Sequence, residues 1–154
     1  MTGWIRKWRQ VSVDKALNYL ALARKAGRIE LGEEPAGAAA RAQHARLVVV
    51  ASDASDHTWR RAQSFVSGTD QQCIRLPFTK DELGQCVGRT SLALAAITDP
   101  ALALAFLKAL DRPEQYQDAL ASLERRTRRV QQRQAEQKAH ARNVRRGRRA
   151  GQKK

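Results

Sequence analysis

Apolar residues along this 154-residue chain follow two alternating spacings, one typical of helices and one typical of buried strands. The short apolar runs predict four strands, over residues 28–31, 47–51, 72–76 and 92–97. Residues 47–51 are apolar without interruption, and this is the pattern of a strand covered on both faces of a sheet.

Stretches with apolar residues three and four positions apart lie between the strands and predict helices. Ser12 can cap the first helix and Gly27 can end it, while Gly32 opens an alanine-rich second helix. A third helix follows the turn at residues 52–55 and ends near Gly68.

Two further helices begin at recognisable caps. Thr79 with Glu82 forms a capping box for a helix that runs to about Val87, and Asp99 caps a helix that begins at Pro100. Because helices and strands alternate with short links, the sequence predicts a three-layer α/β/α sandwich around a four-stranded mixed sheet.

Both ends of the chain depart from this alternation. We therefore divide it into an N-terminal extension (1–12), an α/β/α domain (13–111) and a C-terminal segment (112–154). A helical stripe continues through residues 112–130. Beyond Val130 the only sizeable apolar residue is Val144, so we predict a helix that frays into a flexible basic tail.

The N-terminal extension carries an apolar stripe with basic residues between its members. Trp4 and Trp8 lie one helical turn apart within this stripe. The stripe predicts either an extra helix that covers the sandwich or aromatic residues that stack on bases.

The charge is concentrated at the ends of the chain. The whole chain carries 29 Lys and Arg against 15 Asp and Glu, a formal net charge of +14. Residues 112–154 alone hold fourteen of the basic residues and four of the acidic ones. A nearly neutral body with a basic end indicates a polyanionic partner, and arginine is well suited to phosphate. The tail residues predicted to contact RNA are Arg125, Arg126, Arg128, Arg129, Arg133, Arg142, Arg145, Arg146, Arg148 and Arg149.

Catalytic and metal-binding patterns are missing from the sequence. Cys73 and Cys86 have no zinc spacing, and the three histidines are scattered. The Ser and Asp residues at 52–56 favour turn and cap roles over catalysis. We therefore predict no catalytic residues, no metal, no cofactor and no small-molecule substrate. The basic residues at the N-terminus have no apolar run behind them, so we expect no signal peptide there. The apolar stretch at 92–107 is broken at Pro100, and we predict a cytoplasmic protein with no membrane partner.

Four segments occur in a fixed order at compact spacing: LALARKAGRIELGEE, ARLVVVASDAS, TKDELGQCVGR and LALAAITDPALALAFL. In this order they resemble the kink-turn RNA-binding ribosomal-protein family (L-seven-Ae and its relatives), most closely its bacterial YlxQ-like branch. The resemblance covers residues 13–110. It implies an α/β/α sandwich that binds structured RNA.

The resemblance also implies two neighbouring RNA-binding surfaces. The first is the start of the second helix together with the strand before it, and comprises Arg28, Gly32, Glu33, Glu34 and Pro35. The second is the loop before the last strand, and comprises Gly88, Arg89, Thr90, Ser91 and Leu92. A helix start offers unpaired N–H groups and positive potential.

The two carboxylates at the helix start allow several interpretations. Where archaeal and eukaryotic members of the resembled family carry Thr and Asn, this chain carries Glu33 and Glu34. These carboxylates can interact favourably with the positive end of the helix dipole, accept hydrogen bonds from base amino groups, or repel phosphate.

The sequence therefore predicts a non-catalytic RNA-binding protein, either a ribosomal or a ribosome-associated one, that binds kink-turn-like ribosomal RNA. One alternative is an adaptor that docks on a protein through its α/β body while its basic tail anchors it to RNA. Another is a non-specific DNA-binding factor.

Overall fold

The computed structural model describes residues 15–152, with side chains through Gly147. The predicted cap at Ser12 and the stripe around Trp4 and Trp8 lie outside the described residues.

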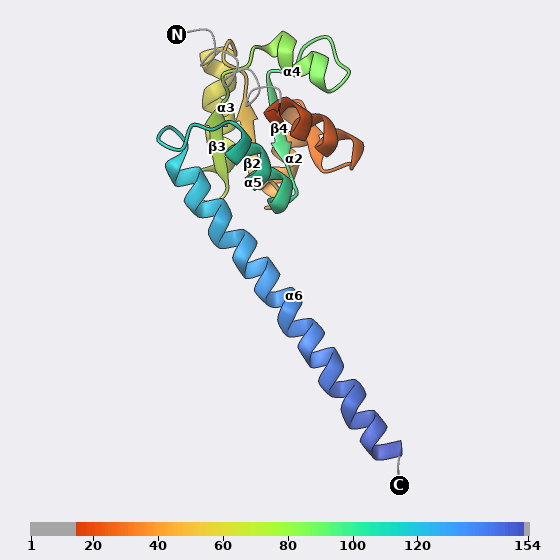
Figure 1. Cartoon of the computed structure of the whole chain (residues 1–154). Coiled ribbons are helices and arrows are strands. Elements are labelled where there is room, and N and C mark those ends of the chain that lie inside the picture. Colours follow the sequence, from red (N-terminus) through yellow and green to blue (C-terminus); the bar gives the residue numbers. More distant parts are fainter. Residues whose placement is uncertain (1–14, 153–154) are drawn as a thin grey trace, which may run out of the picture.

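A four-stranded mixed sheet forms the centre of the body (Figure 1). Its strands are β1 (Ile29–Leu31), β2 (Leu47–Val50), β3 (Gln72–Arg75) and β4 (Leu94–Ile97), in the spatial order β1-β4-β2-β3. β2 runs parallel to β3, whereas β4 runs antiparallel to both β1 and β2. The predicted strands and the mixed character of the sheet are confirmed.

The two inner strands owe their position to their composition. Every residue of β2 (LVVV) and of β4 (LAAI) is buried. Because side chains along a strand point alternately to its two faces, both faces of these strands need a cover. The prediction that residues 47–51 form a strand buried on both sides is confirmed.

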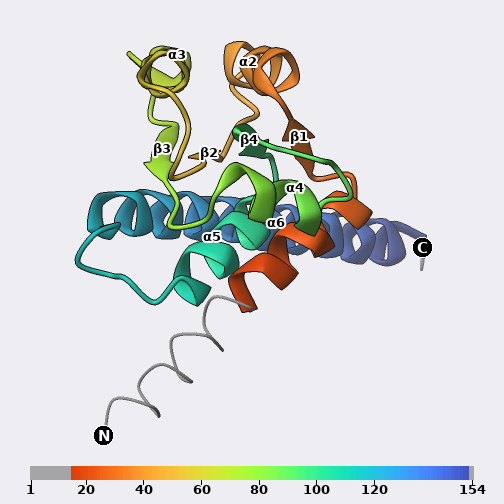
Figure 2. The ribbon, with the colours of Figure 1, turned by 90° about the horizontal axis from the view of Figure 1, so that it is seen from above.

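Helices supply that cover on both faces (Figure 2). One layer contains α2 (Glu33–Arg41) and α3 (Asp56–Val66). The other contains the helix over residues 15–25, α4 (Lys80–Cys86), α5 (Pro100–Ala109) and the first turns of α6 (Gln117–Gln152). The fold is therefore the predicted three-layer sandwich.

Three of the helices begin at side-chain caps. The hydroxyl of Thr79 accepts a hydrogen bond from the Glu82 N–H at 3.2 Å, as the capping box predicts. A carboxylate oxygen of Asp99 accepts from the Leu102 N–H at 3.0 Å, and Ser55 caps α3 at 3.2 Å. Ser55 therefore has the cap role that the sequence favoured.

The C-terminal segment forms one long helix that projects from the body (Figure 1). Helix α6 starts at Gln117, five residues later than the predicted helix, and continues without a break past Val130 to Gln152. Tyr116, Ala119 and Leu123 are buried in the core, so the body extends beyond residue 111. Residues 131–147 are exposed throughout. The flexibility of the tail stays a prediction.

The membrane prediction has one structural counterpart. None of the helices in the described range is both long and apolar enough to cross a bilayer.

The central position of β2 can be tested with one valine. Val49→Asp places a carboxylate where the side chain is 1% exposed, and should lower the free energy of unfolding by at least about 3 kcal/mol. The same substitution at Val144, which is 41% exposed, is the matched control and should leave stability nearly unchanged. Chemical denaturation measures both. Equal stabilities of the two variants would show that β2 is not central.

Candidate nucleic-acid interface

The two predicted surfaces of the body meet at one edge of the sheet. Leu31 of β1 pairs with Ala95 of β4, so the end of β1 adjoins the start of β4. The Gly32 N–H donates to the Leu94 carbonyl at 2.9 Å and fastens the two segments together. We call residues 32–35 and 88–91 the α2 mouth.

Arg89 lies beside Gly32 at the start of α2. The φ of Gly32 is +96°, a conformation that residues with side chains rarely adopt. A Cβ built on Gly32 would lie 3.9 Å from a terminal nitrogen of Arg89, so the guanidinium group lies beside the first residues of the helix. The positive end of the α2 dipole, its unpaired N–H groups and the Arg89 guanidinium therefore face the same space. This combination can hold an anion.

The neighbouring helix engages one of the two carboxylates. An oxygen of Glu33 lies 2.6 Å from Nε of Arg61 on α3, in an ion pair without the alignment of a hydrogen bond. The Arg61 guanidinium also lies 5.8 Å from the ring centre of Phe65. Glu34 and Pro35 are exposed. Glu33 thus has a cationic partner within the protein, and Arg61 is a neighbour of the α2 mouth that sequence reasoning missed.

The loop at 88–91 is held by its close packing on α4. Gly84 accepts a hydrogen bond from the Arg89 N–H at 2.7 Å. A Cβ on Gly84 would lie 2.7 Å from the Ser91 nitrogen and 2.9 Å from the Arg89 carbonyl oxygen, distances too short for any real side chain. Gly84 is therefore the residue that brings this loop to its place. The segment TKDELGQCVGR contains Gly84, but the sequence did not show which residues it contacts.

The members of this loop differ in exposure. Gly88, Arg89, Thr90 and Ser91 are exposed, whereas Leu92 is 4% exposed and belongs to the core. The side chain of Leu92 therefore packs in the core, and an RNA contact at this position is open only to its backbone.

Arg28 lies away from the α2 mouth. It precedes β1, whereas Gly32 follows it, and a three-residue strand separates them by about 13 Å. Arg28 is exposed and lines an open groove of about 520 Å³ beside α2. The other lining residues are Glu30, Pro35, Ala38, Ala39, Ala42, His44 and Thr98. The groove thus extends from Pro35 at the mouth to Arg28 at the opposite edge of the sheet.

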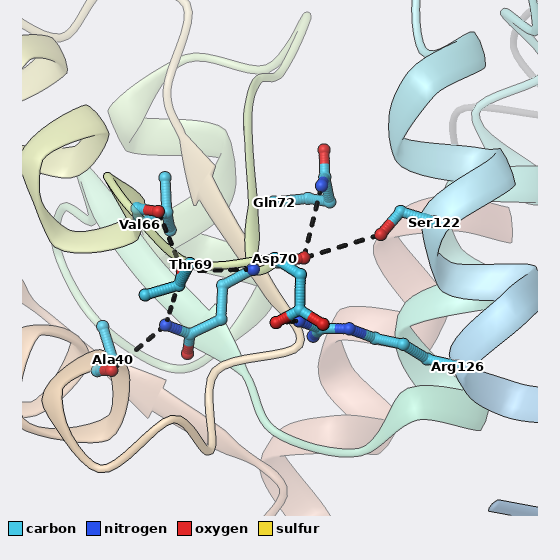
Figure 3. Close-up of polar contacts among 8 residues, drawn as sticks. Ala40, Val66, Thr69, Asp70, Gln72, Ser122 and Arg126 are labelled. Carbon is cyan, nitrogen blue, oxygen red and sulfur yellow. Dashed lines mark hydrogen bonds and ion pairs between the residues drawn. The ribbon is translucent and has the colours of Figure 1, made fainter. Parts of the chain in front are cut away.

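Polar contacts with the β3 edge hold the start of α6 (Figure 3). Arg126 forms an ion pair with Asp70, and the Ser122 hydroxyl donates to the Asp70 carbonyl at 3.5 Å. Burial acts to raise the pKa of Asp70, but the hydrogen bond and charge of Arg126 outweigh it and hold that pKa below its ordinary value. The Arg126 side chain is only 10% exposed. Arg126 therefore anchors α6 and is removed from the predicted RNA contacts.

The other arginines of α6 whose side chains the structure describes are exposed. Arg125, Arg128 and Arg129 are exposed near the body, although Arg128 also lies 4.0 Å from Glu124. The exposed arginines farther along the helix are Arg133, Arg142, Arg145 and Arg146. Arg148 and Arg149 lie within α6, beyond the described side chains.

The two thiols are poorly suited to chemistry. Burial raises the pKa of Cys73 to about 12, despite the opposing charge of Arg75, and burial also raises the pKa of Cys86. The Cys86 thiol donates to the Leu17 carbonyl at 2.9 Å. Across the range that the structure covers, His, Cys, Asp and Glu form no cluster that could hold a metal ion.

The fold defines a class of protein, the three-layer α/β/α sandwich around a four-stranded mixed sheet. A relative identifies the family within this class. The chain is 36% identical over 75 residues to the RNA-binding protein YlxQ of Enterococcus faecium, covering 49% of this chain and 72% of the relative. The chain therefore belongs to the YlxQ family, as the motif order in the sequence indicated.

Solved structures share the fold. A protein of unknown function from Bacillus halodurans C superimposes with a TM-score of 0.59 at 22% identity, covering 64% of this chain and 98% of that one. The Giardia lamblia 15.5kD RNA binding protein gives a TM-score of 0.54 at 18% identity, covering 67% and 88%. No protein-family model matches the chain.

The role of Gly84 yields a prediction about the loop. Gly84→Ala forces the backbone of residues 89–91 to move and should lower the free energy of unfolding by about 1–3 kcal/mol. Amide chemical shifts of residues 88–91 should change more than those of β2. Gly147→Ala, at a helical position with no atom within 4 Å, is the control and should not destabilise the protein. Unchanged shifts in the loop would contradict the packing described.

Proposed function

We propose that the protein binds structured RNA through the α2 mouth, without catalysis, and that α6 adds contacts to the RNA backbone. The observation that carries the proposal is the approach of Arg89 to Gly32 at the start of α2. It places a guanidinium group and unpaired helix N–H groups on one surface, which suits phosphate oxygens. Membership of the YlxQ family, in which the Enterococcus faecium relative is named an RNA-binding protein, supports RNA as the partner.

The finer part of the proposal concerns the kind of RNA. We propose a bent, kink-turn-like element of ribosomal RNA, bound in the cytoplasm by a ribosomal or ribosome-associated protein. A folded body with a small, shaped contact surface favours recognition of RNA shape over a run of sequence. The pairing of Glu33 with Arg61 lowers the repulsion that two free carboxylates would impose on phosphate there.

The contribution of the mouth can be tested with one charge reversal. Arg89→Glu should weaken binding of a kink-turn RNA by about tenfold or more, because it replaces a phosphate-binding group with a repelling one. Arg24→Glu makes the same change of net charge at an exposed residue of the helix over residues 15–25 and should have a much smaller effect. Fluorescence anisotropy measures both affinities.

Arg89→Glu is a cleaner test than any substitution of Gly32, since the positive φ of Gly32 would make a side chain there strain the fold. Equal affinities of the Arg89 and Arg24 variants would exclude the mouth as the RNA site. Binding of a protein by the body, with RNA held by α6 alone, would then become the preferred function.

The contribution of α6 follows from its charge. Truncation after residue 130 removes nine Lys and Arg and one acid, and no residue of the described core. It should lower affinity for a large folded ribosomal RNA at near-physiological salt by at least about tenfold and reduce the salt dependence of that binding. A salt titration of full-length and truncated protein measures this, and an unchanged slope would remove residues 131–154 from the binding surface. The melting temperature should stay close to that of the full chain.

A further inference from the structure

We infer that the α2 mouth and the exposed part of α6 bind two separate RNA segments at the same time. This inference rests on the proposed function and adds the size of the partner: a large folded RNA that presents two sites, rather than a single short stem. It follows from where the sheet places the mouth and where α6 leaves the body.

The strand register places the α2 mouth where β1 and β2 end and β4 begins. Leu94 pairs with Val50 and Ile97 pairs with Leu47, so the start of β4 adjoins the end of β2. β3 runs parallel to β2, and Arg75 pairs with Val50. The α2 mouth and Arg75 therefore lie at the same ends of the strands. Asp70, two residues before β3, lies at the opposite ends.

The beginning of the C-terminal segment runs from the end of β3 at Arg75 to the opposite end at Asp70. The Tyr116 hydroxyl donates to the Arg75 carbonyl at 2.8 Å, on the side of the mouth. Ten residues later, Arg126 pairs with Asp70 at the far side. These two anchors give α6 a direction that leads away from the mouth, as Figure 1 shows for α6 and α4.

Because α6 is long, its exposed part lies far from the α2 mouth. Residues 127–152 continue the helix beyond Arg126, and at 1.5 Å per residue they span about 39 Å, more than the diameter of a small domain. A short RNA stem docked at the mouth would have to bend around the body to follow α6. A second RNA segment meets α6 without such bending.

The exposed part of α6 has the chemistry of an RNA-backbone contact. Lys138, Arg142, Arg145 and Arg146 recur at helical spacing and share one face, all four are exposed, and none takes part in an ion pair among residues 15–147. Glu136 is the single acid between residues 131 and 147. A helix that is polar on all sides and rich in cations on one face is complementary to the negative charge of a phosphate backbone.

A two-RNA capture experiment tests the inference. A biotinylated kink-turn RNA on a surface is saturated with full-length protein, and a separate 20-base-pair RNA duplex is then added in solution. The captured full chain should bind the duplex. The variant Arg142→Gln with Arg145→Gln and Arg146→Gln should bind it at least tenfold more weakly, while its own affinity for the kink-turn RNA stays within twofold.

A control variant makes the same change of charge on the helix over residues 15–25. Lys15→Gln with Arg24→Gln and Lys25→Gln removes three exposed cations and should retain duplex capture. The inference fails if the captured full chain binds no duplex, or if the triple α6 variant loses kink-turn affinity as strongly as duplex affinity. The proposed function fails on a different readout, namely if Arg89→Glu leaves capture by the kink-turn RNA unchanged.

Discussion

Burial of β2 and β4 on both faces determines how the helices are arranged around the sheet. These two neighbouring strands contain eight residues, none of which has a polar side chain, so a helical layer must cover each face of the sheet. Once both faces are covered, ligands can approach only at the strand edges and along the helices. The α2 mouth lies at such an edge because β1 and β4 run antiparallel, which brings Gly32 next to the loop at 88–91 despite a separation of more than fifty residues.

The geometry of the α2 mouth depends on backbone conformation and close packing at two glycines. Gly32 provides a left-handed conformation, Gly84 provides space for a loop, and Arg89 then comes to lie beside a helix start. The carboxylate of Glu33 is drawn toward Arg61 on the neighbouring helix. The electrostatic character of this surface is thus set by contacts between α2, α3 and the loop after α4, and no one of these elements would create it alone.

Local patterns in the sequence predicted the strands, the caps at Thr79 and Asp99, and the layer order, because each depends on residues close together in the chain. Contacts between distant segments could not be predicted in this way. The pairing of Arg126 with Asp70 turned a predicted RNA contact into an anchor, and the burial of Leu92 removed its side chain from the surface. Arg61 was missed because only the packing of α3 beside α2 brings it to Glu33. The polar composition beyond Val130 also led us to predict a fraying helix there, whereas the Gln-, Ala- and Arg-rich sequence continues α6 to Gln152.

The most direct test of RNA binding at the α2 mouth is ultraviolet crosslinking of the full chain to RNA in cells that express it, with the crosslinked amino acids mapped by mass spectrometry and the bound RNA sequenced. We expect crosslinks in two regions of the protein, namely the α2 mouth (residues 32–35 and 88–91) and α6, each joined to a different position of a structured RNA. Crosslinks confined to α6, with none in the body, would contradict it and would leave the body as a surface for a protein partner.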